Sequence, residues 1–277
     1  MTYSIVGHDP DTKEWGIAVQ SKFIGVGAVV PFAKAGVGAV ATQSYANTAY
    51  GPQALQLMEE GKTAEEAIEI ITKDDPEQHL RQVGMIDALG NPATFTGEGC
   101  YNWAGGMTGQ HFAAQGNILV DENTVKAMGE TFSKSEGALA EKLLKALDAG
   151  QDAGGDSRGM QSAAILVVKE NGGYGGFNDR FIDLRVDDHP DPIKELIRIY
   201  QLHQLYFAPS KPKRVVPIQG EITQMLESEL SRLGYHKENK PLNQSLKDYL
   251  HTENFEMREQ EEGRMDLDVL EFMKLQK

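Results

Sequence analysis

Apolar side chains alternate with polar or small ones along several short stretches of the first 205 residues, which is the spacing of half-buried strands. Between these stretches apolar residues recur every three or four positions, as in amphipathic helices. Strands and paired helices therefore follow one another in blocks, unlike the single alternation of a parallel βαβ sheet. The order favours two packed, largely antiparallel sheets with helix pairs on their outer faces. The predicted strands are 3–8, 15–21, 27–32, 37–44, 83–87, 93–96, 112–115, 163–169 and 180–186, and the predicted helices are 52–60, 64–73, 122–132, 139–149 and 191–205.

The last 68 residues have a different pattern. Residues 1–209 hold 26 of the 29 glycines and a net charge of −12, whereas residues 210–277 hold three glycines and a net charge of −2. Two prolines in Ala208–Lys213 disfavour helix at the residues before them, so this segment is a predicted linker. Beyond it, helical spacing recurs over 222–233, 242–251 and 267–275. We therefore predict two domains, 1–209 and 210–277, the second a small helical one.

Overall charge and residue content exclude several classes of protein. The net charge is −14, which disfavours duplex nucleic acid and anionic membrane surfaces as partners. The single cysteine, Cys100, rules out an internal disulfide framework, and the seven histidines lack metal-site spacing, so no metal or cofactor is expected. We find neither a long apolar run nor a signal-peptide pattern in the sequence and expect a cytoplasmic protein.

The most suggestive chemical feature is Thr2. Methionine is commonly trimmed before a small residue, and its removal would put a hydroxyl and a free α-amino group on Thr2. An α-amine has a reference pKa of about 7.7–8.0, so part of it is a neutral base near pH 7 and can accept the hydroxyl proton during attack on a carbonyl. Threonine is also an ordinary second residue, so position alone does not decide its role.

Two other residues are candidates for supporting that attack. Lys34 lies between two predicted strands and is either a solvated turn residue or a cation beside Thr2 that favours its reactive form. Asn117 follows Gln115 and Gly116 at a predicted strand end, where its amide and a backbone N–H would form an oxyanion hole or merely an ordinary turn.

A glycine-rich segment at 151–159 offers binding groups. Its small residues let the backbone approach closely between a helix and a strand, and Asp152, Asp156, Ser157 and Arg158 are predicted to bind a substrate carboxylate or the Thr2 amine. The alternative is a loop at a helix end with a solvated Asp–Arg pair.

Longer motifs resemble a known family. Residues 2–6 (TYSIV), 36–43 (GVGAVATQ) and 178–190 (NDRFIDLRVDDHP) are similar to the domain-of-unknown-function 1028 family, over residues 1–205 as a whole. That family is regarded as resembling the N-terminal nucleophile hydrolases, which implies a four-layer αββα sandwich. Ser21, at the end of one predicted strand, and Gln43, one residue before the end of another, are further predicted substrate-binding residues. Residues 215–277, through motifs at 234–235, 253–258 and 265–270, resemble a peptidoglycan-binding-like domain.

Proteasome β subunits are a more distant comparison. Their mature N-terminal Thr corresponds to Thr2, and the lysine that follows it by 32 positions corresponds to Lys34. The paired Asp of their second strand is replaced by Gln20, and their later Asp-Ala pair resembles Asp152-Ala153 or is replaced by Asp156-Ser157. The loss of the first carboxylate leaves a different proton pathway or a lost activity open.

These observations lead to a functional hypothesis with alternatives. We expect an αββα sandwich with a C-terminal helical domain, acting as an amide-bond hydrolase in which Thr2 attacks, Lys34 supports charge and Asn117 stabilises the oxyanion. The expected substrate is a small amide or peptide-like molecule and the expected assembly a homo-oligomer. A catalytically silent hydrolase-fold protein with a binding or scaffolding role, for example toward cell-wall (peptidoglycan) fragments, is the main alternative, and a non-hydrolytic small-molecule enzyme is the third.

Overall fold

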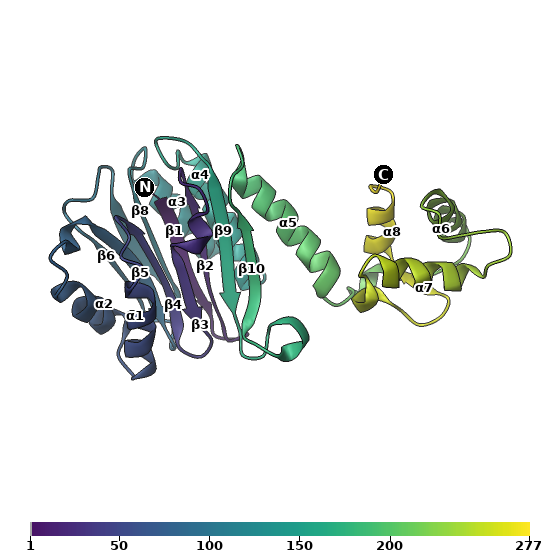
Figure 1. Ribbon diagram of the computed structural model, residues 1–277, viewed down its shortest axis with the longest axis horizontal. Helices are drawn as coiled ribbons and strands as arrows, with labels where there is room; N and C mark the ends of the chain where they lie inside the picture. Colours follow the sequence, from purple (N-terminus) through teal and green to yellow (C-terminus); the bar gives the residue numbers. More distant parts are fainter. Residues whose placement is uncertain (1) are drawn as a thin grey trace. The chain divides into compact units, whose positions relative to one another are not determined.

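The computed structural model describes residues 2–277, and its first unit, 1–198, is built around two antiparallel sheets (Figure 1). The first sheet has six strands in the order β10-β9-β2-β1-β8-β7. Its strands β1 and β2 are central and buried on both faces, which fits their near-continuous apolar and small residues. The bounds are β1 Thr2–Asp9, β2 Glu14–Ser21, β7 Gly105–Gly109, β8 Phe112–Asn117, β9 Ser162–Val168 and β10 Arg180–Val186.

The second sheet has four strands in the order β3-β4-β5-β6 and packs on the first. Helices α3 (Asn123–Lys134) and α4 (Leu139–Asp152) cover the outer face of the six-stranded sheet, and α1 (Tyr50–Glu59) and α2 (Ala64–Lys73) cover that of the four-stranded sheet (Figure 1). This arrangement confirms the predicted αββα sandwich. The bounds are β3 Pro31–Lys34, β4 Gly38–Ser44, β5 Arg81–Asp87 and β6 Pro92–Thr96.

One local prediction in this unit was wrong, and one strand was not predicted. Residues 27–32 do not form one strand: Val26–Ala28 is a 3₁₀ turn after Gly25, whose φ is +64°, and β3 begins only at Pro31. The strand β7 was missed because its glycine-rich sequence carries little apolar alternation. At the start of α2, Thr63 and Glu66 form both hydrogen bonds of a capping box.

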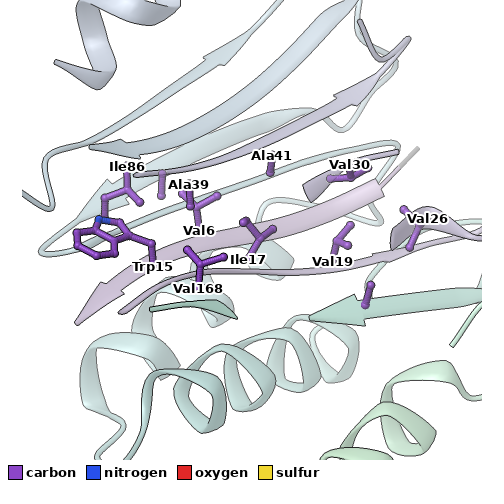
Figure 2. Packing of buried hydrophobic residues seen from close by; sticks show 12 residues of the cluster. Val6, Trp15, Ile17, Val19, Val26, Val30, Ala39, Ala41, Ile86 and Val168 are labelled. Carbon is purple, nitrogen blue, oxygen red and sulfur yellow. The ribbon is translucent and has the colours of Figure 1, made fainter. Parts of the chain in front are cut away.

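An apolar layer separates the two sheets. Because side chains alternate along a strand, Val6 of β1 points into this layer, whereas Gly7 faces Phe132 and Leu143 of the helices. Figure 2 shows the layer running from Trp15 and Ile86 at one end to Val26 and Val30 at the other. The same alternation places Thr2 and Ser4 on the side of β1 that faces the second sheet.

The second unit, 199–277, has its own apolar core. It consists of α6 Glu221–Arg232, α7 Leu242–Thr252, α8 Leu267–Met273 and the short paired strands β11 Val215–Pro217 and β12 Arg264–Asp266. The division falls within α5 (Pro192–Phe207), earlier than the expected boundary near 209, because Leu205 and Tyr206 pack against this core. A separately folding domain from residue 210 stays a prediction. Among the described residues no helix is long and apolar enough to cross a membrane.

Candidate functional site

Thr2 begins the central strand β1 and lies between two neighbouring strands of the same sheet. It is paired with Ser21 at the end of β2 and with Asn117 at the end of β8. Its hydroxyl donates a hydrogen bond of 3.0 Å to the hydroxyl of Ser21, and the residue is only 5% exposed. The hydroxyl is thus held in a defined position at one end of the sandwich.

A network of buried amide side chains fixes the carbonyl of Thr2. Gln43 of β4 donates to the Thr2 carbonyl oxygen at 3.2 Å, and Asn117 donates to it at 3.4 Å. Both amides also donate to Oε1 of Gln82 at 2.8 Å, and Gln82 in turn donates to the carbonyl of Gly116 at 2.7 Å. Gln82, which lies on β5, therefore links the two sheets through hydrogen bonds next to Thr2.

The network continues one step deeper along β1. Ser4 donates to Gln43 Oε1 at 2.6 Å and accepts from Gln115 Nε2 at 2.6 Å. Gln115 fits there only because residue 84 is glycine: a Cβ at Gly84 would lie 1.9 Å from Gln115 Oε1. Buried amides are costly unless they are paired, so a network of this kind fixes one geometry between the sheets.

Thr2 opens onto a pocket of about 360 Å³, which is within the usual range of small-molecule sites. One wall is apolar and comes from the segment between β2 and β3, and the opposite wall comes from the end of β4 and the start of β5. Ser44, on the second wall, has a positive φ of +70°, which is unusual for a non-glycine residue and places it at the turn out of β4. The lining residues are Thr2, Ser21, Phe23, Val26, Val29, Val30, Gln43, Ser44, Tyr45, Ala46 and Arg81.

Arg81 carries the one charged side chain among the residues that line this pocket. Its guanidinium donates to Asp75 at 2.9 Å, to Glu77 at 2.7 Å and to the carbonyl of Tyr45 at 2.7 Å. The hydrogen bond from Arg81 holds the pKa of Asp75 well below its usual range, and the same pairing raises the pKa of Arg81. The cation therefore stays charged and already has two carboxylate partners.

The structure brings three of the predicted site residues to Thr2: Ser21, Gln43 and Asn117. Ser21 and Gln43 line the pocket, and Asn117 lies directly beside Thr2 on the adjacent strand. The amide nitrogen of Asn117, however, donates to the Thr2 carbonyl and to Gln82. An oxyanion role for Asn117 would require it to give up one of these bonds.

The expected position of Lys34 beside Thr2 was wrong. Lys34 ends β3 and is paired with Gly38 at the start of β4, five residues before Gln43, which is roughly 17 Å along the strand. Its side chain is half exposed and forms an ion pair with Glu59 of α1. The offset of 32 positions does not bring it to the nucleophile because β3 begins next to Val30, which lines the pocket, and runs away from Thr2, so that Lys34 lies at the far end of the second sheet.

The segment 151–159 contacts the residues that follow β2 and β8, but it does not line the pocket. Asp152 is exposed at the end of α4, and Ser157 is exposed with its N–H bonded to the carbonyl of Ile118. Asp156 is buried, accepts from the backbone N–H of Lys22 at 3.1 Å and pairs with Arg158 at 2.8 Å. It thus supports the residue that follows Ser21, but none of the four predicted side chains lines the pocket.

Gln20 does not occupy the position of a carboxylate partner to Thr2. It pairs with Tyr3 and points to the helix-covered face, because Ser21, its neighbour, points to the pocket face. Both side-chain amide atoms of Gln20 are buried without a partner among the described residues.

The described residues, 2–277, contain no group of three or more His, Cys, Asp or Glu side chains that could hold a metal ion.

The sequence analysis missed Ser4, Gln82, Gln115 and Arg81. The signal was present: inward positions of three predicted strands carry Ser4, Gln43 and Gln115 where apolar residues would be expected, and Gln82 directly precedes a fourth predicted strand. Polar side chains at inward positions near the ends of several strands indicate that these strand ends meet at a polar site.

A family model and a solved structure assign the first unit to the same protein family. Residues 2–196 match the model described as "Family of unknown function (DUF1028)". The chain belongs to this family. The crystal structure of the DUF1028 protein SPO2555 from Silicibacter pomeroyi is 34% identical, covers 73% of this chain and 86% of its own, and superposes with a TM-score of 0.68. Residues 206–273 match a second model, described as "Putative peptidoglycan binding domain".

Other matches are more distant. A Gly-1 mutant of Anbu from a Hyphomicrobium strain is 12% identical, with 76% of this chain and 99% of its own covered and a TM-score of 0.36. Anbu (ancestral beta-subunit) from Yersinia bercovieri is 11% identical, with 73% and 94% covered and a TM-score of 0.32. No curated protein matches the chain significantly.

Proposed function

We propose that this protein hydrolyses an amide bond with Thr2 as the nucleophile. The observation that carries the proposal is the Thr2 hydroxyl, hydrogen-bonded to Ser21 at the floor of a pocket while Gln43 and Asn117 hold the Thr2 carbonyl. A nucleophile must be held beside the reacting carbonyl with its base within hydrogen-bonding reach, and these contacts hold the hydroxyl of Thr2 in place.

In the proposed reaction Met1 has been removed and the α-amine of Thr2 is the base. Thr2 Oγ1 bonds to the substrate carbonyl carbon while its proton passes to the amine. The proton then goes to the departing nitrogen as the C–N bond breaks, which leaves an ester on Thr2. Water, deprotonated by the same amine, attacks this ester, releases the acid and restores the hydroxyl. Ser21 positions Oγ1, and Asn117 with Gln82 positions the start of the strand.

The test is covalent trapping on protein whose N-terminus is Thr2, as verified by intact mass. A panel of acyl p-nitroanilides should give an acyl adduct on the N-terminal peptide and release p-nitroaniline. Thr2→Ala should abolish both signals, whereas Thr2→Ser, which keeps a hydroxyl, should retain them. Equal adduct on wild type and Thr2→Ala, or no adduct with any panel member, contradicts the proposal.

A binding protein on the same fold is the second candidate. It is favoured by one observation: besides Arg81 and the Tyr45 hydroxyl, no ionisable side chain of a described residue lines the pocket. In that case the panel compounds bind to wild type and Thr2→Ala equally and are recovered intact.

We also propose that the C-terminal unit binds a cell-wall fragment. The family match over 206–273 supports it, together with an open cleft of about 620 Å³ beside α7 that is lined by Tyr235, Lys237, Lys240, Asp248 and His251 among others. A disaccharide-peptide fragment titrated into the full chain should bind, and Lys237→Glu should weaken binding about fivefold or more. Lys211→Glu, outside this cleft, is the matched control.

A further inference from the structure

The two walls of the Thr2 pocket differ in chemistry. The segment between β2 and β3 contributes Phe23, Val26, Val29 and Val30, of which Val26 and Val30 are buried and Phe23 is about half exposed. The other wall contributes Gln43, Ser44, Tyr45 and Arg81, of which Gln43 is buried beside Thr2 and Tyr45 is more than half exposed. The apolar side is therefore enclosed at Val26 and Val30, and the polar side is open at Tyr45.

The apolar wall is fixed before any ligand arrives. The backbone N–H of Val26 donates to Ser162 Oγ at 3.1 Å, and that of Gly25 donates to the carbonyl of Asp187 at 2.9 Å. Gly27 lies so close to β9 that a Cβ there would be 2.6 Å from the Cβ of Ala164. Val30 is tied to β4 by a hydrogen bond from the N–H of Thr42 to its carbonyl. Figure 2 shows Val26 and Val30 near the same end of the apolar layer.

The charged groups at the polar wall do not form a binding site for an anion. Arg81 is engaged by Asp75 and Glu77, so the group as a whole carries one negative charge in excess. A carboxylate entering the pocket would have to displace one of these partners or be buried unpaired, and an ammonium would lose its hydration against the valines. Neither charge is matched on the enclosed side.

The order in which the two products leave indicates which wall contacts each part of the substrate. The amine product leaves first and must reach solvent, whereas the acyl group stays on Thr2 until water attacks. The enclosed side therefore suits the acyl group and the open side suits the departing amine. At roughly 30 Å³ per non-hydrogen atom, the share of a water molecule in the liquid, the whole pocket has room for about twelve such atoms.

From this asymmetry we propose that the substrate is an N-acyl compound whose acyl group is uncharged and apolar, seated against Val26, Val29 and Val30. The proposal rests on the proposed hydrolysis at Thr2 and names its substrate class. Val29 is the residue that sets the preference, since it lines the pocket and is less enclosed by the core than its two neighbours.

Three matched probes test it: hexanoyl, 6-aminohexanoyl and adipoyl p-nitroanilides, which share a six-carbon chain and differ only in the charge at its end. Wild-type protein should be acylated by the hexanoyl probe at least about tenfold faster than by either charged probe. Val29→Asp should remove most of this advantage over the cationic probe. Ala28→Asp, exposed and outside the pocket lining, should leave the order unchanged.

The outcomes separate the two proposals. A charged probe that acylates as fast as the hexanoyl probe overturns the substrate class while hydrolysis at Thr2 stands. If no probe acylates, hydrolysis fails, and the same three compounds are titrated into Thr2→Ala by calorimetry. Tighter binding of the hexanoyl compound by about tenfold then supports the apolar pocket on its own, and equal or reversed affinities overturn it.

Discussion

The two ends of the layer between the sheets handle buried polar groups differently. At the Thr2 end, Gln43, Gln82 and Asn117 form hydrogen bonds with one another and with the Thr2 carbonyl. At the opposite end, the ring of His8 stacks on Trp15 at 4.7 Å and meets His111 edge-on at 5.5 Å. There Nδ1 of each histidine is buried without a partner among the described residues. One end is a hydrogen-bonded amide network beside a pocket, in which Oε1 of Gln115 is buried without a partner among the described residues, and the other is an aromatic plug formed by His8, Trp15 and His111.

The difference lies in what each end must hold. The amides fix the start of β1 and the hydroxyl at its tip, which requires directional bonds from both sheets. The plug only closes the layer beneath two hairpin turns: the indole of Trp15 donates to the carbonyl of Asp87, and a Cβ on Gly90 would lie 2.3 Å from His111 Nδ1. Directional bonding at one end and ring packing at the other therefore predict different responses to substitution.

The largest stability effect is expected from Gly84→Ala. The new methyl would overlap the Gln115 amide, which is enclosed between the sheets, so the variant should lose on the order of 3 kcal/mol of unfolding free energy. Chemical denaturation measures this. If the clash is the cause, the added Gln115→Ala change should make the double variant less destabilised than the sum of the two single ones. Strict additivity would mean that Gly84 does not make room for Gln115.

A smaller loss of unfolding free energy is expected from Ser4→Ala. It removes the acceptor of the Gln115 amide and the donor to Gln43, and so leaves two buried polar groups unpaired at a cost of about 2 kcal/mol. Thr2→Ala, at the edge of the same network, should cost clearly less because Gln43 and Asn117 bond to its backbone carbonyl rather than its side chain. Equal losses for the two variants would show that the network does not depend on Ser4.

The plug should respond to pH rather than to hydrogen-bond deletion. Burial, then the neighbouring His111, lowers the pKa of His8 below its ordinary 6.5, although Asp9 and Asp87 oppose the shift. Below about pH 6.5 the unfolded chain therefore binds a proton more readily than the folded one, so stability falls as the pH drops through this window. His8→Phe keeps the stacked ring without the titration and should flatten the fall in melting temperature between about pH 7 and pH 5 by about 2 °C. The tryptophans, Trp15 and Trp103, report on this unit, and an unchanged slope would contradict the assignment.

The sequence predicted the layers well and the site only in part. Strand alternation and helix pairing are local properties, so β1, β2, α3 and α4 were placed within a few residues. The site depends on which strand ends meet, and the pairing of Thr2 with Asn117 and Ser21 follows from tertiary register rather than from spacing. Lys34 was misplaced for the same reason, because a fixed offset along the chain holds only if the intervening turn is the same. Here the turn is a 3₁₀ segment seated on β9.

The smallest effect is expected from Lys34→Ala, and it tests whether the two ends are independent. Lys34 forms a half-exposed ion pair with Glu59, and such pairs contribute little to stability, so the melting temperature should change by no more than about 1 °C. Because Lys34 lies at the far end of β4 from Gln43, acylation of Thr2 by the probes should stay within about twofold of wild type. Lys34→Glu, which reverses the charge beside Glu59, is the stronger variant and should behave the same way toward the probes. Loss of acylation in either variant without unfolding would mean that the lysine reaches the nucleophile after all, and the site built around Ser21, Gln43 and Asn117 would then have to be redrawn.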